Sequence, residues 1–452
     1  MKKTGFVLLF SLISWISMGQ VSYHYAEGSY AYSGNREIVR TDNNSNVVTY
    51  REDATGQGHF ECHTATSTAS FNHALIPTGW KIYDFRILNG IVYFCGFDSA
   101  NSEGLFGTFT LNDLLLYGGM ITYRKADVTP GTTTYYAKLA VAKDANSQIQ
   151  VMLLGRNEQN VSASSFGCNR VAFVPDMNNL SINTLFNPHM SYNIQDTAEV
   201  VWDVVATDNY FATVGNMRYA MGNTLTLRRA PIGSTLNQFN TDYFYGNQYY
   251  EPGTWMGITR ATRLNNDDLA VASLYNDENH LYGTTIYNID VSTTNVNNNQ
   301  FFNNYTKTDP VCMVYLPSVK RLALSEWLYL QNNTHYSGVI YLQPYNYSSY
   351  NAEEHCNSSA NAPDIQSIDL FANSQYFGAG SDSWFFIDYP AGIATTNTCI
   401  KTFKRKVVQK TVIQHSQSAP PNLTSTPFLG TFTNYNIFPV DSRSITNSCL
   451  SQ

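Results

Sequence analysis

The sequence predicts an all-β protein built as a single β-propeller, and three observations support this fold class. Residues 82–96, IYDFRILNGIVYFCG, have the pattern of two strands joined by an Asn-Gly turn. Similar segments return at residues 202–215 and 368–380, and no stretch of the chain needs a helical pattern. The copies follow one another at a regular spacing, which is typical of propeller blades.

Three aspartates set that spacing. Asp84 and Asp203 lie 119 residues apart across two units, and Asp203 and Asp369 lie 166 residues apart across three, which gives 57 residues per unit. Six units open near residues 80, 135, 199, 257, 311 and 365. The strands before residue 77 and the tail after residue 389 hold enough chain for one more unit.

We therefore favour seven blades, with the last blade closed by strands from the N- and C-terminal ends of the chain. Such closure leaves few strand edges exposed. Six blades are the second choice, and two stacked β-sandwiches are a further alternative, although sandwiches do not require a regular period.

Residues 1–19 have the composition of a secretory signal peptide. Lys2 and Lys3 precede an apolar run at residues 6–16, and small residues follow at 17–19. The run is shorter than the ~20 residues that cross a bilayer, and no later run in the sequence is long enough for a transmembrane segment. We expect one propeller domain at residues 20–452, exported to the periplasm, the outer-membrane surface or the extracellular space.

The charge balance argues against nucleic acid as a partner. The net charge is −7, and removal of Lys2 and Lys3 with the signal peptide makes it −9. Nucleic-acid binding needs clustered Lys and Arg, but charged residues make up only 13% of the chain. The sequence does not indicate an oligomeric state.

The seven cysteines do not form a disulfide framework, because seven is few for a chain of this length and the number is odd. Cys399 and Cys449 flank the last segment, so we predict a disulfide between them. Cys95 and Cys312 lie in apolar strand patterns and are predicted to be buried free thiols. No Cys-x-x-Cys pair is present, and we predict no metal or other cofactor.

Residues 401–410, KTFKRKVVQK, are predicted to form a basic edge strand. Lysines on an edge strand oppose edge-to-edge aggregation. A basic patch that binds an acidic partner is the alternative.

The units resemble those of uncharacterised secreted β-propeller proteins of Bacteroidetes-type bacteria, which carry short, kelch-like repeats. The resemblance rests on Asp84–Gly96 and its weaker copies. The Gly-Gly pair of kelch repeats is absent from matching places, and Trp202-Asp203 opens a strand, whereas the Trp-Asp of WD repeats closes a unit. The resemblance implies a secreted propeller and assigns no functional residue.

Three sets of residues are candidates for function, and two of them lie at or near the inner strands. Asp84, Asp203 and Asp369 are predicted to line the central channel, where they would bind a cation or a polar ligand, or would accept backbone N–H bonds from a neighbouring loop and fix the register between blades. Aromatic residues before the inner strands would stack on a ligand at one face, or would pack between blades; they are Trp80, Tyr135, Tyr136 and Trp255.

His59, Glu61 and His63 would project from one face of a strand. Two histidines and a carboxylate could bind a metal, although no ligand from another strand can be assigned. The alternative is a polar strand that faces solvent.

Enzyme signatures such as GxSxG, HExxH and a Walker loop are absent from the sequence. We expect a non-enzymatic binding propeller that recognises a glycan or a protein partner through aromatic-rich loops. The alternative is a hydrolase or lyase that acts on polysaccharide in the central funnel. Converging acidic, basic or aromatic side chains in a funnel pocket would favour the enzyme.

Overall fold

The computed structural model describes the chain in segments, and every structural statement below concerns these residues alone. They are 22–26, 32–42, 46–53, 55–64, 71–116, 119–127, 135–156, 170–177, 181–186, 199–219, 222–233, 242–247, 258–276, 282–304, 308–329, 335–342, 351–357, 365–370, 375–380, 383–388, 400–408, 412–417, 426–429, 431–438, 441–443 and 446–447. The predicted signal peptide, Trp255, Cys399 and Cys449 lie outside them.

The all-β prediction is confirmed: the described residues form antiparallel sheets and one short helix, α2 (Leu111–Leu115). None of their helices is long and apolar enough to cross a membrane.

Five of the six sheets have five strands each. The first contains β2 (Tyr32–Thr41), β3 (Asn46–Asp53), β4 (Gly58–Thr64), β5 (Phe71–Leu75) and β33 (Asp441–Arg443). The second contains β6 (Trp80–Leu88), β7 (Ile91–Asp98), β8 (Glu103–Thr110), β9 (Ile121–Asp127) and β32 (Phe432–Ile437). The third contains β10 (Tyr135–Lys143), β11 (Ile149–Arg156), β12 (Arg170–Val174), β13 (Ser181–Phe186) and β31 (Thr426–Leu429). The fourth contains β14 (Glu199–Ala206), β15 (Tyr210–Tyr219), β16 (Gly222–Pro231), β17 (Asp242–Asn247) and β30 (Val412–Gln417).

The fifth of these sheets combines both ends of the chain. It contains β26 (Ile365–Leu370), β27 (Gln375–Gly380), β28 (Ser383–Asp388), β1 (Ser22–Ala26) and β34 (Thr446–Asn447). The remaining sheet has nine strands, in the order β18 (Thr259–Arg263), β19 (Asp268–Asn276), β20 (Tyr282–Asp290), β21 (Asn295–Asn304), β29 (Ile400–Val408), β25 (Asn351–Asn357), β24 (His335–Leu342), β23 (Arg321–Tyr329) and β22 (Thr308–Leu316).

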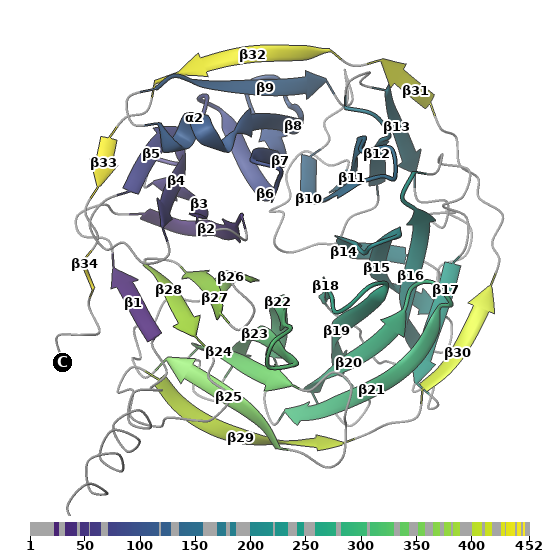
Figure 1. Ribbon diagram of the computed structural model, residues 1–452. Helices are drawn as coiled ribbons and strands as arrows, with labels where there is room; N and C mark the ends of the chain where they lie inside the picture. The colour runs from purple at the N-terminus through teal and green to yellow at the C-terminus, as the bar shows by residue number, and fades with distance from the viewer. Residues whose placement is uncertain are drawn as a thin grey trace, which may run out of the picture.

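The sheets are arranged around a centre (Figure 1). Along the chain, consecutive strands pair in runs of up to four, and the strand that begins each run, which we call a first strand, lies innermost. These first strands contact one another in the order β2, β6, β10, β14, β18, β22 and β26, and β26 contacts β2 in turn. This arrangement is consistent with a β-propeller-like architecture.

Strands β29–β34, which we call the outer belt, cover the outer edges of all six sheets. They lie around the periphery of the molecule in Figure 1, and they pair with the sheets in reverse chain order, from β25 and β21 back to β1. The tail therefore supplies a strand to every sheet, whereas we expected it to complete a single blade together with the N-terminal strands. The basic segment at 401–408 is also not an edge strand, because β29 pairs with β25 on one side and with β21 on the other.

Strands from both ends of the chain share two of the sheets. Tyr25 of β1 pairs with Trp384 of β28 on one side and with Asn447 of β34 on the other. In the other of the two sheets, β5 from the strands before residue 77 pairs with β33 of the tail.

The hairpin of β6 and β7 has the predicted turn. Asn89 and Gly90 both have positive φ, at 54° and 72°, as a type I′ turn requires. Gly96 pairs with Ile82, and a β-bulge follows between Ile82 and Asp84. A Cβ at Gly96 would overlap the carbonyl oxygen of Lys81, so the close approach of the two strands requires glycine there.

The described core lies between neighbouring sheets, and the second sheet buries apolar side chains on both of its faces. Phe60 of β4 packs edge-on against Phe85 of β6, with ring centroids 5.3 Å apart. On the other face of the second sheet, Tyr93 and Phe106 belong to a cluster with Leu139 and Leu153 of the third. This stacking holds the first strands side by side at the centre.

Candidate functional site

A pocket of about 270 Å³ lies at the centre, and all seven first strands line it. Its walls therefore come from residues spread over the chain from Arg40 to Asp369. Ligand pockets commonly form where several elements converge on one concave site.

A repeated β-bulge places side chains in or beside this pocket. It occurs in five of the first strands, directly before Asp84, Lys138, Asp203, Cys312 and Ser367. In four of these strands the residue before the bulge pairs with a glycine; these are Gly96, Gly155, Gly215 and Gly380. Bulges commonly re-aim side chains beside functional sites.

The pocket lining is rich in positive charge. Five cationic side chains contribute to it, namely Arg40, Arg86, Lys138, Arg260 and Arg263, against the two carboxylates of Asp203 and Asp369. This excess contrasts with the net charge of −7 for the whole chain. A concave site lined mainly by one sign of charge attracts ligands of the other sign.

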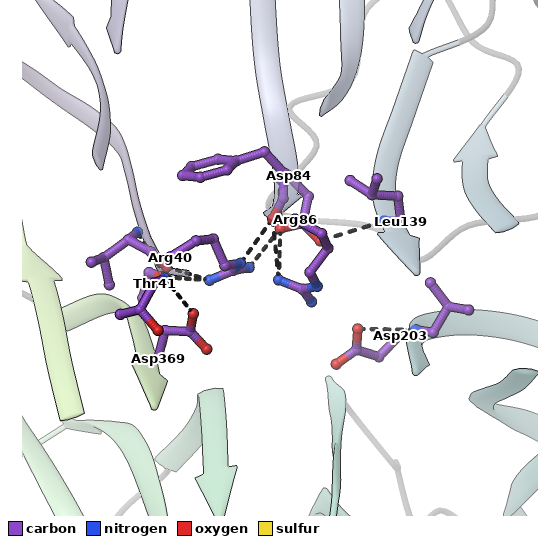
Figure 2. A network of polar contacts seen from close by, with 11 residues as sticks. Arg40, Thr41, Asp84, Arg86, Leu139, Asp203 and Asp369 are labelled. Atoms are coloured by element: carbon purple, nitrogen blue, oxygen red, sulfur yellow. Dashed lines mark hydrogen bonds and ion pairs between the residues drawn. The ribbon is translucent and has the colours of Figure 1, made fainter. Parts of the chain in front are cut away.

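Asp84 lies buried beside the pocket and is neutralised by two arginines. Its Oδ1 accepts a hydrogen bond from Arg40 at 2.5 Å and one from Arg86 at 3.3 Å (Figure 2). Burial alone would raise the pKa of this carboxyl, but Arg86, Arg40 and Lys138 lower it to about 2. Asp84 is therefore ionised at neutral pH, and it offsets one of the cationic charges.

Arg40 joins three consecutive sheets and has little capacity left for a ligand. Its Nε donates to the carbonyl of Phe85 at 2.9 Å, and its Nη2 donates to Asp84. Its Nη1 donates to the carbonyl of Val39 at 2.7 Å and to Ser367 Oγ at 2.9 Å. The guanidinium thus connects β2 with β6 on one side and with β26 on the other.

Lys138 differs from Arg40 because it has no hydrogen-bond or ion-pair partner among the described residues. Burial lowers the pKa of Lys138, and the carboxylates of Asp84 and Asp203 offset part of this shift. Lys138 lines the pocket, and no described residue occupies its amino group in place of a ligand.

The carboxylates of Asp203 and Asp369 line the pocket from β14 and β26, and Figure 2 shows them on either side of Arg86. Asp203 Oδ2 accepts a hydrogen bond from the backbone N–H of Ala261 at 3.1 Å, and Asp369 Oδ2 accepts one from Thr41 at 2.8 Å. Burial raises the pKa of Asp369, although nearby Arg40 and Arg86 oppose the shift.

The three predicted aspartates all contact the next first strand in the ring. Asp84 Oδ2 accepts a hydrogen bond from Leu139 N–H at 3.4 Å, which corresponds to the Asp203–Ala261 contact on another strand pair. These are the register-fixing contacts of the second interpretation, with donors on a neighbouring strand in place of a loop. Asp203 and Asp369 each line the pocket and also hold a backbone N–H, and their binding of a ligand stays a prediction.

Asp369 is not the counterpart of Asp84, which corrects the sequence alignment. Ser367 directly follows the bulge in β26, and its Oγ accepts the hydrogen bond from Val39 N–H at 3.2 Å. Asp369 stands two residues further along the strand, at the position that Arg86 occupies in β6.

Three of the four predicted aromatic residues are buried. Trp80 and Tyr135 are each 4% exposed and Tyr136 is 0% exposed, so their rings are not available for stacking on a ligand. Trp80 packs against Tyr123 and against Tyr435 of the outer belt. The packing alternative accounts for these three residues, and Trp255 lies outside the described residues.

The cysteine predictions have mixed outcomes. Cys95 is buried and forms no disulfide, as predicted, whereas Cys312 forms no disulfide either but is only half-buried, at the pocket wall. Burial raises the pKa of the Cys312 thiol to about 11. The predicted disulfide between Cys399 and Cys449 involves residues that are not described.

The strand with His59 and Glu61 does not face solvent, which contradicts that alternative. His59 is 4% and Glu61 1% exposed. One ring nitrogen of His59 contacts His73, and the other lies 3.1 Å from Asp53 Oδ2. Within the described part of the chain, no three His, Cys, Asp or Glu side chains lie close enough together to hold a metal, and the side chain of His63 is not described.

Comparison with known proteins gives no relative: no protein-family model and no curated protein sequence matches the chain. The resemblance to secreted propellers of Bacteroidetes-type bacteria stays a prediction.

The sequence-based search missed Arg40, Arg86, Lys138 and Arg260. Lys138 occupies the same position after the bulge as Asp84 and Asp203. Lys138 could therefore have been identified from its position in the hairpin, although its residue type differs from that of the two aspartates.

Proposed function

We propose that the chain forms a seven-bladed β-propeller closed by β1. Seven runs of four antiparallel strands support this count. In this count β29 is an outer strand that joins two runs of the nine-stranded sheet, and β1 is the fourth strand of the last run. The contact of β26 with β2 supports a closed ring. In this architecture the pocket lies on the propeller axis and belongs to all seven blades.

We propose further that the protein is an exported, non-enzymatic binding protein that takes an acidic ligand in the central pocket. The observation that carries this proposal is the excess of Arg and Lys in the lining of a pocket within an acidic chain. An acidic glycan fits better than a protein partner, because a pocket of about 270 Å³ admits a small group and not a protein face.

A glycan array with the purified protein tests this function. We expect binding to acidic glycans, weakened by salt, and no binding to neutral ones. Lys138→Gln removes the unpartnered cation and is expected to weaken binding. Lys143→Gln is the matched control, because Lys143 is exposed at the far end of the same strand. Equal binding of neutral and acidic glycans, or equal behaviour of the two variants, would contradict the proposal.

A hydrolase or lyase that acts on polysaccharide is the second candidate. It is favoured by the two carboxyl groups that line the pocket from different strands, Asp203 and Asp369. Glycoside hydrolysis uses two carboxyl groups across a cleft, and one of them must retain its proton. The raised pKa of Asp369, which burial causes, suits that general acid.

Incubation of the wild-type protein with acidic oligosaccharides separates the two candidates. An enzyme would release shorter products, and Asp369→Asn would stop release without abolishing binding. Binding without any cleavage across the panel would exclude the enzymatic function for those substrates.

A further inference from the structure

The charges around the pocket wall are not evenly distributed. In ring order, Arg40, Arg86 and Lys138 lie on three consecutive first strands, β2, β6 and β10. The carboxylates of Asp369 and Asp203 lie on the strands at either end of this cationic arc, β26 and β14. Beyond Asp203, Arg260 and Arg263 line the pocket from β18, and Arg263 is paired with Asp208. The arc itself thus offers a seat for an anion with a hydrogen-bond acceptor on each side.

Two members of the arc have donors to spare. Arg86 uses only its Nη1, which donates to Asp84 Oδ1 at 3.3 Å and to the Phe85 carbonyl at 3.4 Å. Lys138 has no partner among the described residues. A guanidinium and an ammonium group on adjacent strands can together donate to a carboxylate.

The two flanking carboxylates are fixed but not saturated. Backbone N–H groups orient them, because Asp203 accepts from Val204 and Ala261, and Asp369 accepts from Thr41. A carboxylate has about four acceptor positions, so each retains capacity for a further donor. They would repel a second anionic group and would accept hydrogen bonds from hydroxyls.

Charge balance decides between hydroxyls and an ammonium group on the ligand. Arg263 forms an ion pair with Asp208 at 2.5 Å, so the five cations of the lining face four carboxylates, those of Asp84, Asp203, Asp208 and Asp369, and exceed them by one. A ligand with a net negative charge complements this excess, whereas a zwitterion does not. Between the charged groups the wall has apolar side chains, such as Ala140, Val205 and Val314, on which the C–H face of a sugar ring can pack.

We propose that the ligand of the central pocket is a hydroxylated monocarboxylic acid, such as a sugar acid at the end of a glycan. Its carboxylate binds Lys138 and Arg86, and its hydroxyls donate to Asp203 and Asp369. This inference rests on the proposed acidic-ligand function and specifies the chemical class of the ligand.

Calorimetric titration of the wild-type full-length protein with glucuronate, glucose, glucosamine and inorganic sulfate tests the inference. We expect glucuronate to bind roughly ten- to a hundredfold more tightly than sulfate or glucose, because it alone uses both kinds of group. Lys138→Gln should weaken glucuronate and sulfate alike. Asp203→Asn and Asp369→Asn should weaken the binding of glucuronate and leave the binding of sulfate unchanged or tighter. Asp113→Asn on α2 is the control.

The outcomes separate the failure of this inference from the failure of the proposed function. Equal affinity for sulfate and glucuronate would show that the pocket binds anions but that the ligand hydroxyls contribute nothing, which would overturn the inference. Tighter binding of glucosamine would overturn the inference in favour of a cationic group. No binding of either anion would overturn the acidic-ligand function itself. The wild-type comparison does not depend on whether a variant folds, and thermal unfolding of each variant identifies those that do not.

Discussion

The centre and the rim of this ring are held together in different ways. At the centre, buried polar side chains join neighbouring first strands: Asp84 reaches Leu139, Asp203 reaches Ala261 and Ser367 reaches Val39. At the rim, the outer belt joins the sheets through backbone pairing, and the side chains of β32 are half-buried or exposed. Contacts at the centre depend on single residues, whereas contacts at the rim depend on many equivalent backbone groups.

This difference explains why the charged residues lie at the centre. A buried carboxylate needs specific partners, so it fixes one register between two strands. The same groups leave donors and acceptors for a ligand. Backbone pairing at the rim is tolerant of sequence, which suits a belt of short strands. The following predictions test how far this contrast holds.

Removal of the whole outer belt should have the largest effect. A chain that ends at residue 399 leaves the outer edge of all six sheets uncovered. We expect the free energy of unfolding to fall by an amount comparable with the total stability of a domain, ~5–15 kcal/mol, and the chain to aggregate through the open strand edges. Thermal unfolding and sedimentation measure this. A chain that ends at residue 438 loses only β33 and β34 and should unfold near the wild-type temperature. A soluble, stable short chain would show that the rim contributes little.

Replacement of Arg40 tests the centre. Arg40→Ala leaves the Asp84 carboxylate buried with one weaker partner, and loss of one member of a buried ion pair costs about 3–5 kcal/mol. Arg86→Ala is the matched variant and should cost less, because the Arg86 side chain is 32% exposed. Urea unfolding of both variants gives the difference. Equal losses would show that Arg40 is not the principal link.

The pH dependence of stability should separate two carboxyls of the centre. The pKa of Asp84 is about 2 in the folded protein and 3.8 for an unperturbed aspartate. The charged carboxylate therefore stabilises the fold above pH 4. About 2 kcal/mol should be lost as the pH falls from about 4 to about 2. The stability difference between wild type and Asp84→Asn should therefore shrink over this range.

Asp369 should behave in the opposite way, because burial raises its pKa and its charged form opposes folding at neutral pH. Asp369→Asn should leave stability at pH 7 unchanged or increased. Equal and parallel pH profiles for the two variants, measured by urea unfolding between pH 2 and pH 7, would contradict both assignments.

A single side chain of the outer belt should have the smallest effect. Tyr435→Ala removes an edge-on ring contact with Trp80, at 4.9 Å between centroids, and should cost about 1 kcal/mol. Phe438→Ala is the control, because Phe438 is 70% exposed. A loss as large as that of Arg40→Ala would show that the belt also depends on individual side chains.

Local patterns predicted local structure well. The Asn89-Gly90 turn and the strands on either side of it follow from alternation and from the need for positive φ. Alignment on residue type then placed Asp369 opposite Asp84, although the bulge shows that Ser367 takes that place. Backbone pairing and not residue type defines equivalent positions.

The outer belt and the cationic lining could not be predicted in this way. The partner of β29 is β25 on one side and β21 on the other, and neither pairing leaves a turn signal in the sequence. Nothing in the local sequence distinguishes Arg86 and Lys138 from other charged residues of the strands. Only the convergence of seven strands makes them one site.

The outer belt also sets the order in which the protein can be completed. Each of the six sheets contains a strand from residues 400–447, which leave the ribosome after all of the first strands. No sheet can therefore reach its final set of strands during synthesis of the earlier segments, and pairing over such long sequence separations is slow. A chain that terminates before residue 400 lacks a strand in every sheet at once, so proteases can recognise such an unfinished copy at any of its sheets.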